Sequence, residues 1–191
     1  MIKKDYSLTK TPPNAQRRPQ NERDDNWIRS FLHTAEIGHI ATQWDDQPFL
    51  TPTTFWYDEE RHSIVFHSNI IGRVRANIER HPKVCFEASR QGNFLPSNVA
   101  LEFTVQYASV IVFGVARILD DPEEERRVLY GLIGKYFSGM SPGKDYRPIT
   151  DGELARTSVY AIDIESWSGK ENWPEQAKQS DEWPPPDISN R

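Results

Sequence analysis

Residues 64–82 read IVFHSNIIGRVRANIERHP, and the pattern changes twice within this stretch. The apolar run at its start has the composition of a β-strand, and it ends in the polar triplet His-Ser-Asn. Gly72 then allows a tight turn or the close approach of a ligand to the backbone. The residues after it predict a short helix, which stops before Pro82 because a residue that precedes proline avoids the helical conformation.

The turn between this strand and this helix combines groups that bind anions. Arg73 and Arg75 fall in the first turns of the predicted helix, close to the hydroxyl and amide side chains that end the strand. Backbone N–H groups at a helix N-terminus and one or two guanidinium groups together suit a phosphate monoester. The alternative interpretation is a helix whose arginines are only solvated, and the spacing does not separate the two.

The rest of the chain shows strand and helix patterns without an internal repeat. A helix is predicted over residues 25–36 with Asp25 as its N-cap, a second begins at Asp121, and a capping box opens a third at Thr150. Six runs predict strands, namely IGHIATQW, PFLTPTTFWYD, SIVFHS, KVCFEAS, residues 101–119 with a bend near Gly114, and SVYAIDIESW, while GNFLPSN predicts a loop. Because no regular βαβ alternation is present, we expect an α+β fold, a mainly antiparallel six-stranded barrel with peripheral helices.

A chain of 191 residues fits one domain with tails. Residues 1–25 have almost no core-forming side chains and predict a disordered arm, whereas residues 26–170 hold the domain. Residues 171–191 are rich in proline and predict an extended tail. Trp173 and Trp183 are unusual in such a tail, and we expect them to dock on the domain or on a second subunit.

Composition argues against several classes of function. The net charge of −5 argues against nucleic-acid binding, which needs a basic surplus. No apolar run is long enough to span a membrane, and the N-terminus carries no secretion signal, so we expect a soluble cytoplasmic protein. Cys85, the single cysteine, has apolar neighbours and predicts a buried side chain rather than a nucleophile. The five histidines lack metal-ligand spacing, so no metal site is expected, and no Gly-rich phosphate loop is present.

Five motifs in order resemble a known family. The stretch VFHSNIIGRVRANIERHPKVCFE is similar to the strand, turn and helix that hold the FMN phosphate in the pyridoxamine 5′-phosphate oxidase family, the FMN-binding split barrels. The motifs HTAEIGHIAT, QPFLTPTTFWYD, YASVIVFGVARI and VYAIDIESWSGK support the likeness, which covers roughly residues 27–170. The likeness is greater to the branch of 5-nitroimidazole-resistance (NimA-like) flavin-nucleotide-binding proteins. Each motif alone is weak, and the order of all five makes the signal specific.

The resemblance implies a split barrel that forms a homodimer with flavin, FMN or alternatively FAD, at the subunit interface. It also implies roles for particular positions. The backbone of the second strand would lie along the isoalloxazine ring, Arg73 would bind the phosphate, and Trp167 would approach from the other subunit. Ser109 stands where the oxidases have a flavin-contacting glutamine, and Lys170 adds a cation beside Trp167. The full set of expected flavin-site residues is Phe49, Leu50, Thr51, Pro52, Thr53, Thr54, His67, Ser68, Arg73, Ser109, Trp167 and Lys170.

Two departures from the family pattern concern the activity. The oxidases follow the phosphate-binding arginine with a lysine, but this chain has Val74, and Arg75 lies about 100° further round the helix. The oxidases also end in an Arg-Leu-His-Asp-Arg-like run that binds the pyridoxal substrate, and this chain has WSGKENWPEQAKQ in its place. We therefore expect a flavin site without pyridoxamine-phosphate oxidation.

Two classes of function follow from these expectations. In the first, the protein is an oxidoreductase that passes electrons from NAD(P)H through the flavin to a small electron-poor acceptor such as a nitroaromatic or a quinone. His67 is then the one candidate proton donor, although a flavin-site or core residue is an equally good interpretation. In the second, the protein stores or senses flavin without turnover. A third option keeps the barrel and changes the ligand to haem or a deazaflavin, with His67 as the axial ligand of a haem.

Overall fold

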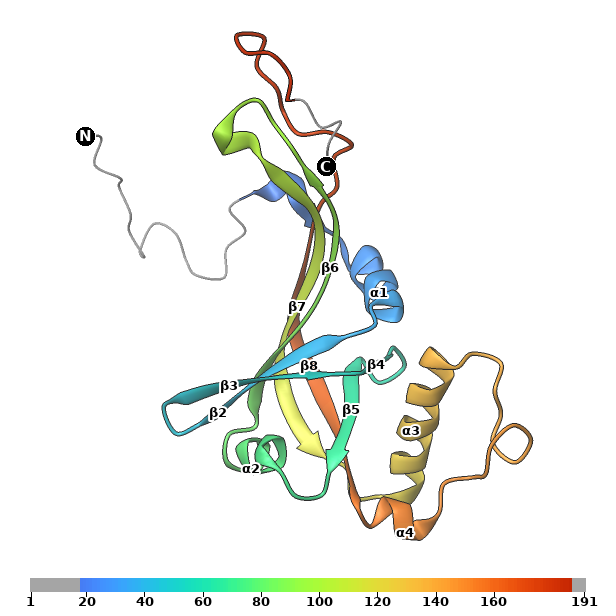
Figure 1. Cartoon of the computed structure of the whole chain (residues 1–191). Coiled ribbons are helices and arrows are strands. Elements are labelled where there is room, and N and C mark those ends of the chain that lie inside the picture. Colours follow the sequence, from blue (N-terminus) through green and yellow to red (C-terminus); the bar gives the residue numbers. More distant parts are fainter. Residues whose placement is uncertain (1–17, 187–191) are drawn as a thin grey trace.

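The computed structural model describes residues 18–186, which form an α+β fold built on an eight-stranded antiparallel sheet (Figure 1). The strand order is β3-β2-β6-β7-β8-β5-β4, and β1 pairs with β8 off this path. The strands are β1 (Glu22–Arg23), β2 (Gly38–Trp44), β3 (Gln47–Thr53), β4 (Trp56–Asp58), β5 (Ser63–Asn69), β6 (Lys83–Leu95), β7 (Thr104–Ile118) and β8 (Thr157–Asn172). The predicted fold class is therefore confirmed, and the six predicted runs all contain strands.

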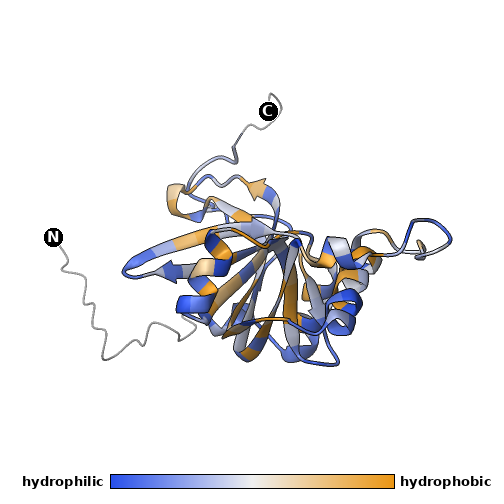
Figure 2. Ribbon diagram, turned by 90° about the horizontal axis from the view of Figure 1, so that it is seen from below, coloured by the Kyte–Doolittle hydropathy of each residue, from blue (hydrophilic) through white to orange (hydrophobic). Residues whose placement is uncertain are grey.

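The sheet curls around the main apolar core, and Figure 2, seen from below, shows the hydrophobic residues along its strands. Alternate residues of each strand point inward, and Phe55, Phe86 and Tyr160 are among the largest fully buried side chains. The predicted bend lies where the pairing of β7 with β8 shifts register, between Phe113 and Gly114. A Cβ at Gly114 would collide with the carbonyl oxygen of Asp163, so close approach of the backbone requires glycine there.

Helices pack against the barrel at three places. Helix α1 (Asp25–Thr34) buries Ile28, Phe31 and Leu32 in the core, and its N-cap is Asp24 instead of the predicted Asp25. Helix α2 (Arg73–Arg80) stops before Pro82 as predicted and contacts β2. Helix α3 (Pro122–Tyr136) covers β4 and β5, and α4 (Asp151–Leu154) has the predicted capping box. Short 3-10 helices span Pro19–Asn21 (η1) and Ala100–Glu102 (η2).

Helix α3 is tied to the sheet by polar as well as apolar contacts. Val128 and Leu132 pack on Val65 of β5 in a second, smaller core cluster. Arg127 Nη2 donates to Oδ2 of Asp58 at 2.6 Å, and the Asp58 side chain is almost fully buried in β4. Near the helix C-terminus, the Lys135 ammonium donates to the carbonyl of Leu32, and burial lowers the pKa of Lys135 to about 8.

Three predicted boundaries were wrong. The run PFLTPTTFWYD divides into β3 and β4, which lie at opposite ends of the sheet order. Strand β6 continues through residues 92–95, where a loop was predicted, and it forms a long arm with β7 (Figure 1). Residues 19–23, assigned to the disordered arm, form η1 and β1, with Arg23 paired to Gly169. Residues 1–17 of that predicted arm lie outside the described residues.

The C-terminal segment runs back along this arm (Figure 1). Strand β8 extends to Asn172, and the residues after it bind the hairpin end of β6 and β7. Ser97 Oγ donates to the carbonyl of Lys178 at 2.6 Å, and the Ser180 N–H donates to Oδ1 of Asn98 at 2.8 Å. The tail thus packs on its own domain as far as Trp183, whose carbonyl accepts from Asn98, and the last five residues of the predicted tail lie outside the described part.

Two features are absent from residues 18–186. No helix in that part of the chain is long and apolar enough to cross a membrane. Nor does it contain a group of three or more His, Cys, Asp or Glu side chains placed to hold a metal ion.

Candidate functional site

The N-terminus of α2 faces β3, and two of the predicted site residues meet there. The Arg73 guanidinium lies 4.5 Å from the centre of the Phe49 ring. Arg73 has no carboxylate partner among the described residues, and its side chain remains exposed. The preceding turn is held by Asn69, whose Oδ1 accepts the N–H of Ile71 at 3.0 Å. A free guanidinium therefore stands at the start of a helix, as an anion site requires.

Gly72 is the N-cap of α2 and leaves this helix end open. It contributes no side-chain cap, so the first N–H groups of α2 keep their capacity to donate. Its φ of 167° is extended backbone, and a Cβ placed on it would meet no atom within 4 Å. The local fold therefore does not need glycine for space. The space in front of the helix is therefore open, and a side chain at this position would partly fill it.

Arg75 does not replace the missing family lysine. Its Nε donates to Glu79 at 2.8 Å, and its Nη1 donates to the hydroxyl of Ser158 at 3.0 Å. These bonds hold the side chain against β8 and its own helix. Val74, which occupies the lysine position, packs against the main core instead. Arg73 is thus the one arginine of the pair that is available to an anion.

Strand β3 carries five of the six predicted ring-binding residues, from Phe49 to Thr53, and Thr54 follows directly after it. Within residues 18–186 it pairs only with β2, so one backbone edge of β3 is free to bond a ligand. Its side chains alternate: Phe49, Thr51 and Thr53 are half-buried, whereas Leu50 is 66% exposed. In the pairing with β2, Leu50 lies opposite Ala41, and Thr51 lies opposite the fully buried Ile40.

His67 and Ser68 were predicted to flank the same flavin, but their side chains point to opposite faces of β5. Ser68 Oγ lies 2.9 Å from the hydroxyl of Tyr160, whose ring belongs to the barrel core. His67 lies on the same face as Val65 and lines a cavity under α3. Partial desolvation there lowers the pKa of the His67 imidazole, which is therefore neutral at pH 7.

Ser109, Trp167 and Lys170 lie on the long strands, away from Arg73. Ser109 of β7 is paired with Lys170 of β8. The Trp167 Nε1–H donates to Asp25 Oδ1 at 2.8 Å, and Arg29 lies 5.2 Å from the Trp167 ring centre. Thr157, at the start of β8, pairs with Asn69 at the end of β5, close to Arg73 in the sequence. Trp167 lies ten positions further along β8, which is roughly 30 Å along a strand. One chain therefore does not bring Trp167 to the Arg73 end of the barrel.

The outer face of the sheet carries a feature that the sequence analysis missed. Three apolar side chains are exposed there: Leu50 by 66%, Ile111 by 37% and Phe113 by 46%. The strand pairing places Leu50 of β3, Ala41 of β2, Cys85 of β6 and Phe113 of β7 side by side in one row across four strands. Ile111 lies one row away, beside Glu87. The signal was present in SVIVFG, where apolar residues occupy both alternating positions of the strand.

The sequence of this chain matches the family described as pyridoxamine 5′-phosphate oxidase over residues 24–171. No curated protein matches it.

Several solved structures share the fold. The flavocytochrome Anf3 from Azotobacter vinelandii superposes with a TM-score of 0.77 at 22% identity, over 88% of this chain and 76% of that one. The FAD and heme binding protein from Mycobacterium smegmatis has a TM-score of 0.72 at 20% identity, over 85% and 78%. A candidate 5-nitroimidazole antibiotic resistance protein from Bacteroides thetaiotaomicron has a TM-score of 0.66 at 18% identity, over 78% and 84%. At these identities the likeness establishes the fold alone.

Proposed function

The chain belongs to the pyridoxamine 5′-phosphate oxidase family, and we propose that it is a flavoprotein whose two copies hold FMN between them, with FAD as the alternative nucleotide. The observation that carries the proposal is the open N-terminus of α2. There an unpaired Arg73, an uncapped helix and the empty space beside Gly72 combine on one side of β3. The comparisons support it, because two proteins with this fold are described as a flavocytochrome and as an FAD and heme binding protein.

In this proposal each element of the site has a separate task. Arg73 and the first N–H groups of α2 bind the phosphate, since both are directed at a ligand that carries negative charge. The free backbone edge of β3 binds the polar edge of the isoalloxazine ring. The flavin, once bound, supplies hydride and electron transfer, and the protein sets its orientation and access.

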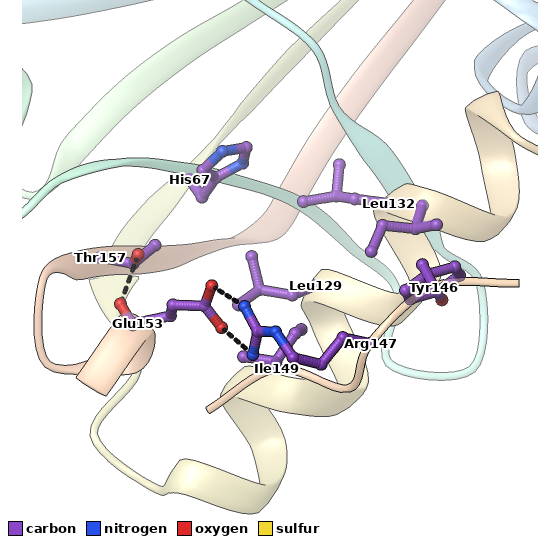
Figure 3. A pocket seen from close by; sticks show the side chains of 9 residues that line it. His67, Leu129, Leu132, Tyr146, Arg147, Ile149, Glu153 and Thr157 are labelled. Carbon is purple, nitrogen blue, oxygen red and sulfur yellow. Dashed lines mark hydrogen bonds and ion pairs between the residues drawn. The ribbon is translucent and has the colours of Figure 1, made fainter. Parts of the chain in front are cut away.

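The proposed activity is reduction of a small electron-poor molecule, such as a nitroaromatic or a quinone, at the expense of NAD(P)H. We do not extend it to oxidation of pyridoxamine 5′-phosphate, because the residues after Trp167 lack the basic run that would bind that substrate. No side chain is assigned as proton donor. His67, the earlier candidate, lines the cavity under α3 (Figure 3), and Arg73 is not among the residues that line that cavity.

Anaerobic addition of NADPH or NADH to the flavin-loaded protein tests the activity. We expect the flavin absorbance bands to bleach and to recover when a quinone or a nitroaromatic compound is added. Bands that persist with both nicotinamide cofactors would contradict the oxidoreductase and leave the second function, flavin binding without turnover. A Soret band in the purified protein would instead identify haem as a bound group.

The dimer is proposed because the outer sheet face is apolar and because Trp167 lies far from Arg73 within one chain. Phe113→Glu places a charge in the exposed row and is expected to dissociate the dimer, from about twice 22.2 kDa to 22.2 kDa in light scattering. Leu101→Glu, at a residue of η2 that is 94% exposed, is the matched control and should leave the mass unchanged. A wild-type protein of 22.2 kDa with flavin bound would contradict the shared site.

A further inference from the structure

A histidine and a carboxylate form a pair on the outer face of the sheet, one row from Leu50 and Phe113. Nδ1 of His39 in β2 lies 3.0 Å from Oε2 of Glu87 in β6, and the two residues stand opposite each other in the strand pairing. The side chains are 35% and 31% exposed, so water reaches both of them in a single chain. Among residues 18–186, His39 is the only ion-pair partner of Glu87.

The row that contains this pair is otherwise apolar on both sides. The strand pairing continues it to Pro52 of β3 beyond His39 and to the exposed Ile111 of β7 beyond Glu87. The other titratable side chains within two rows on this face are Lys83, Cys85, Tyr107, Asp163 and Lys170, with Glu165 in the bulge of β8. None of them is an ion-pair partner of Glu87, so the charge of the pair depends on His39.

Protonation of His39 decides whether the pair carries a net charge. Imidazole is the side chain that changes its charge between pH 5 and pH 8. With the ring protonated, the pair is a charge-assisted hydrogen bond without net charge, whereas a neutral ring leaves the negative charge of Glu87. Cys85 in the neighbouring row adds no charge, because burial, and after it the charge of Glu87, raise the pKa of its thiol.

We propose that two copies of the chain meet over the His39–Glu87 pair, and that the dimer forms with the uptake of one proton at each His39. The inference rests on the outer-face dimer proposed above, because the pair lies beside the exposed row of that interface. In the monomer, water screens the Glu87 charge, and a neutral His39 costs little. In the dimer the same charge loses water, and a two-fold axis brings a second copy of it into one interface.

The sign of the pH dependence follows from this difference. The dimer favours protonated His39 more strongly than the monomer does, so association is strongest at low pH and weakens as the pH rises. Sedimentation velocity of the purified full-length protein, in dilution series at pH 6 and pH 8, measures the effect. We expect the dimer Kd to rise by about 10-fold or more between the two pH values, since two protons are linked to each dimer.

Three substitutions assign the effect to this pair. His39→Gln has no charge to gain, so its Kd should be equal at the two pH values and close to that of wild type at pH 8. Glu87→Gln leaves protonated His39 as the unpaired charge, so its dimer should be tighter at pH 8, the reverse of wild type. His33→Gln is the matched control: its ring lies 3.1 Å from Glu59 in an exposed pair on α1, and the wild-type pH dependence should remain.

A wild-type Kd that is equal at the two pH values, or lower at pH 8, would overturn the inference, as would a pH dependence that persists in His39→Gln. In these outcomes the dimer itself stands and only the role of the pair fails. A chain that is monomeric at both pH values would contradict the outer-face dimer, and this inference with it. If the wild-type dimer stays intact at the lowest measurable concentration, the same comparison is made in Leu50→Ala, which weakens the apolar row.

Discussion

Arg73→Ala is expected to weaken FMN binding by about 10- to 150-fold, as measured by fluorescence titration. This range corresponds to the loss of one charge-assisted contact to a phosphate, about 1.5–3 kcal/mol. The guanidinium has no carboxylate partner among the described residues, so its removal leaves no protein charge unpaired. The folded state should therefore be little affected, and the loss should fall on the ligand.

Two variants at the same helix sharpen this test. Arg75→Ala is the matched control: Glu79 and Ser158 hold that side chain, and FMN binding should stay within about 2-fold of wild type. Gly72→Val keeps both arginines and fills the opening in front of α2, where the chain itself offers no obstacle within 4 Å. It should reduce FMN binding as strongly as Arg73→Ala. Equal affinity of the wild type and Arg73→Ala would remove Arg73 from the site.

Arg127→Met is expected to lower the free energy of unfolding by about 2–3 kcal/mol, measured by urea denaturation at pH 7. The variant leaves the Asp58 carboxylate without its ion-pair partner, and that carboxylate is almost fully buried. Breaking a fully buried pair costs about 3–5 kcal/mol, and the smaller figure here reflects the partial exposure of Arg127 to solvent.

Arg126→Met, one residue earlier in α3, is the control for this effect. Arg126 pairs with Glu123 at 2.7 Å and with Asp151, and the side chains of both carboxylates are more than 80% exposed. Solvent stabilises those carboxylates when the arginine is removed, so the change should stay below about 1 kcal/mol. An equal loss in the two variants would show that the Asp58 pair contributes no more than a surface ion pair.

Local sequence signals predicted the local structure of this chain correctly. The end of α2 before Pro82, the capping box of α4 and the irregularity at Gly114 depend on neighbouring residues and on backbone conformation, and each was predicted. The boundary errors concern strands whose extent is set by distant partners. Residues 92–95 look like a loop by composition, yet they belong to β6, and Phe94 and Leu95 pair with residues of β7 more than eight positions further along the chain.

The candidate site shows the same division. The approach of Arg73 to Phe49 follows from a strand-turn-helix pattern that the sequence displays. The alternation of side chains along a strand predicts that His67 and Ser68 point to opposite faces of β5. The sequence does not show that α3 covers the His67 face, because that helix begins more than fifty residues later. The cavity under α3 also needs the segment 137–150, which has no helical or strand pattern from which its position could be predicted.

The most direct test of the account is a titration of the purified full-length protein with FMN, followed by absorbance and by light scattering. The account predicts flavin bands from one FMN bound per chain, in a particle of about twice 22.2 kDa, and weakened binding in Gly72→Val. A protein that binds neither FMN nor FAD, or that binds flavin equally well with valine at position 72, would contradict the claim that the open end of α2 is a flavin-phosphate site.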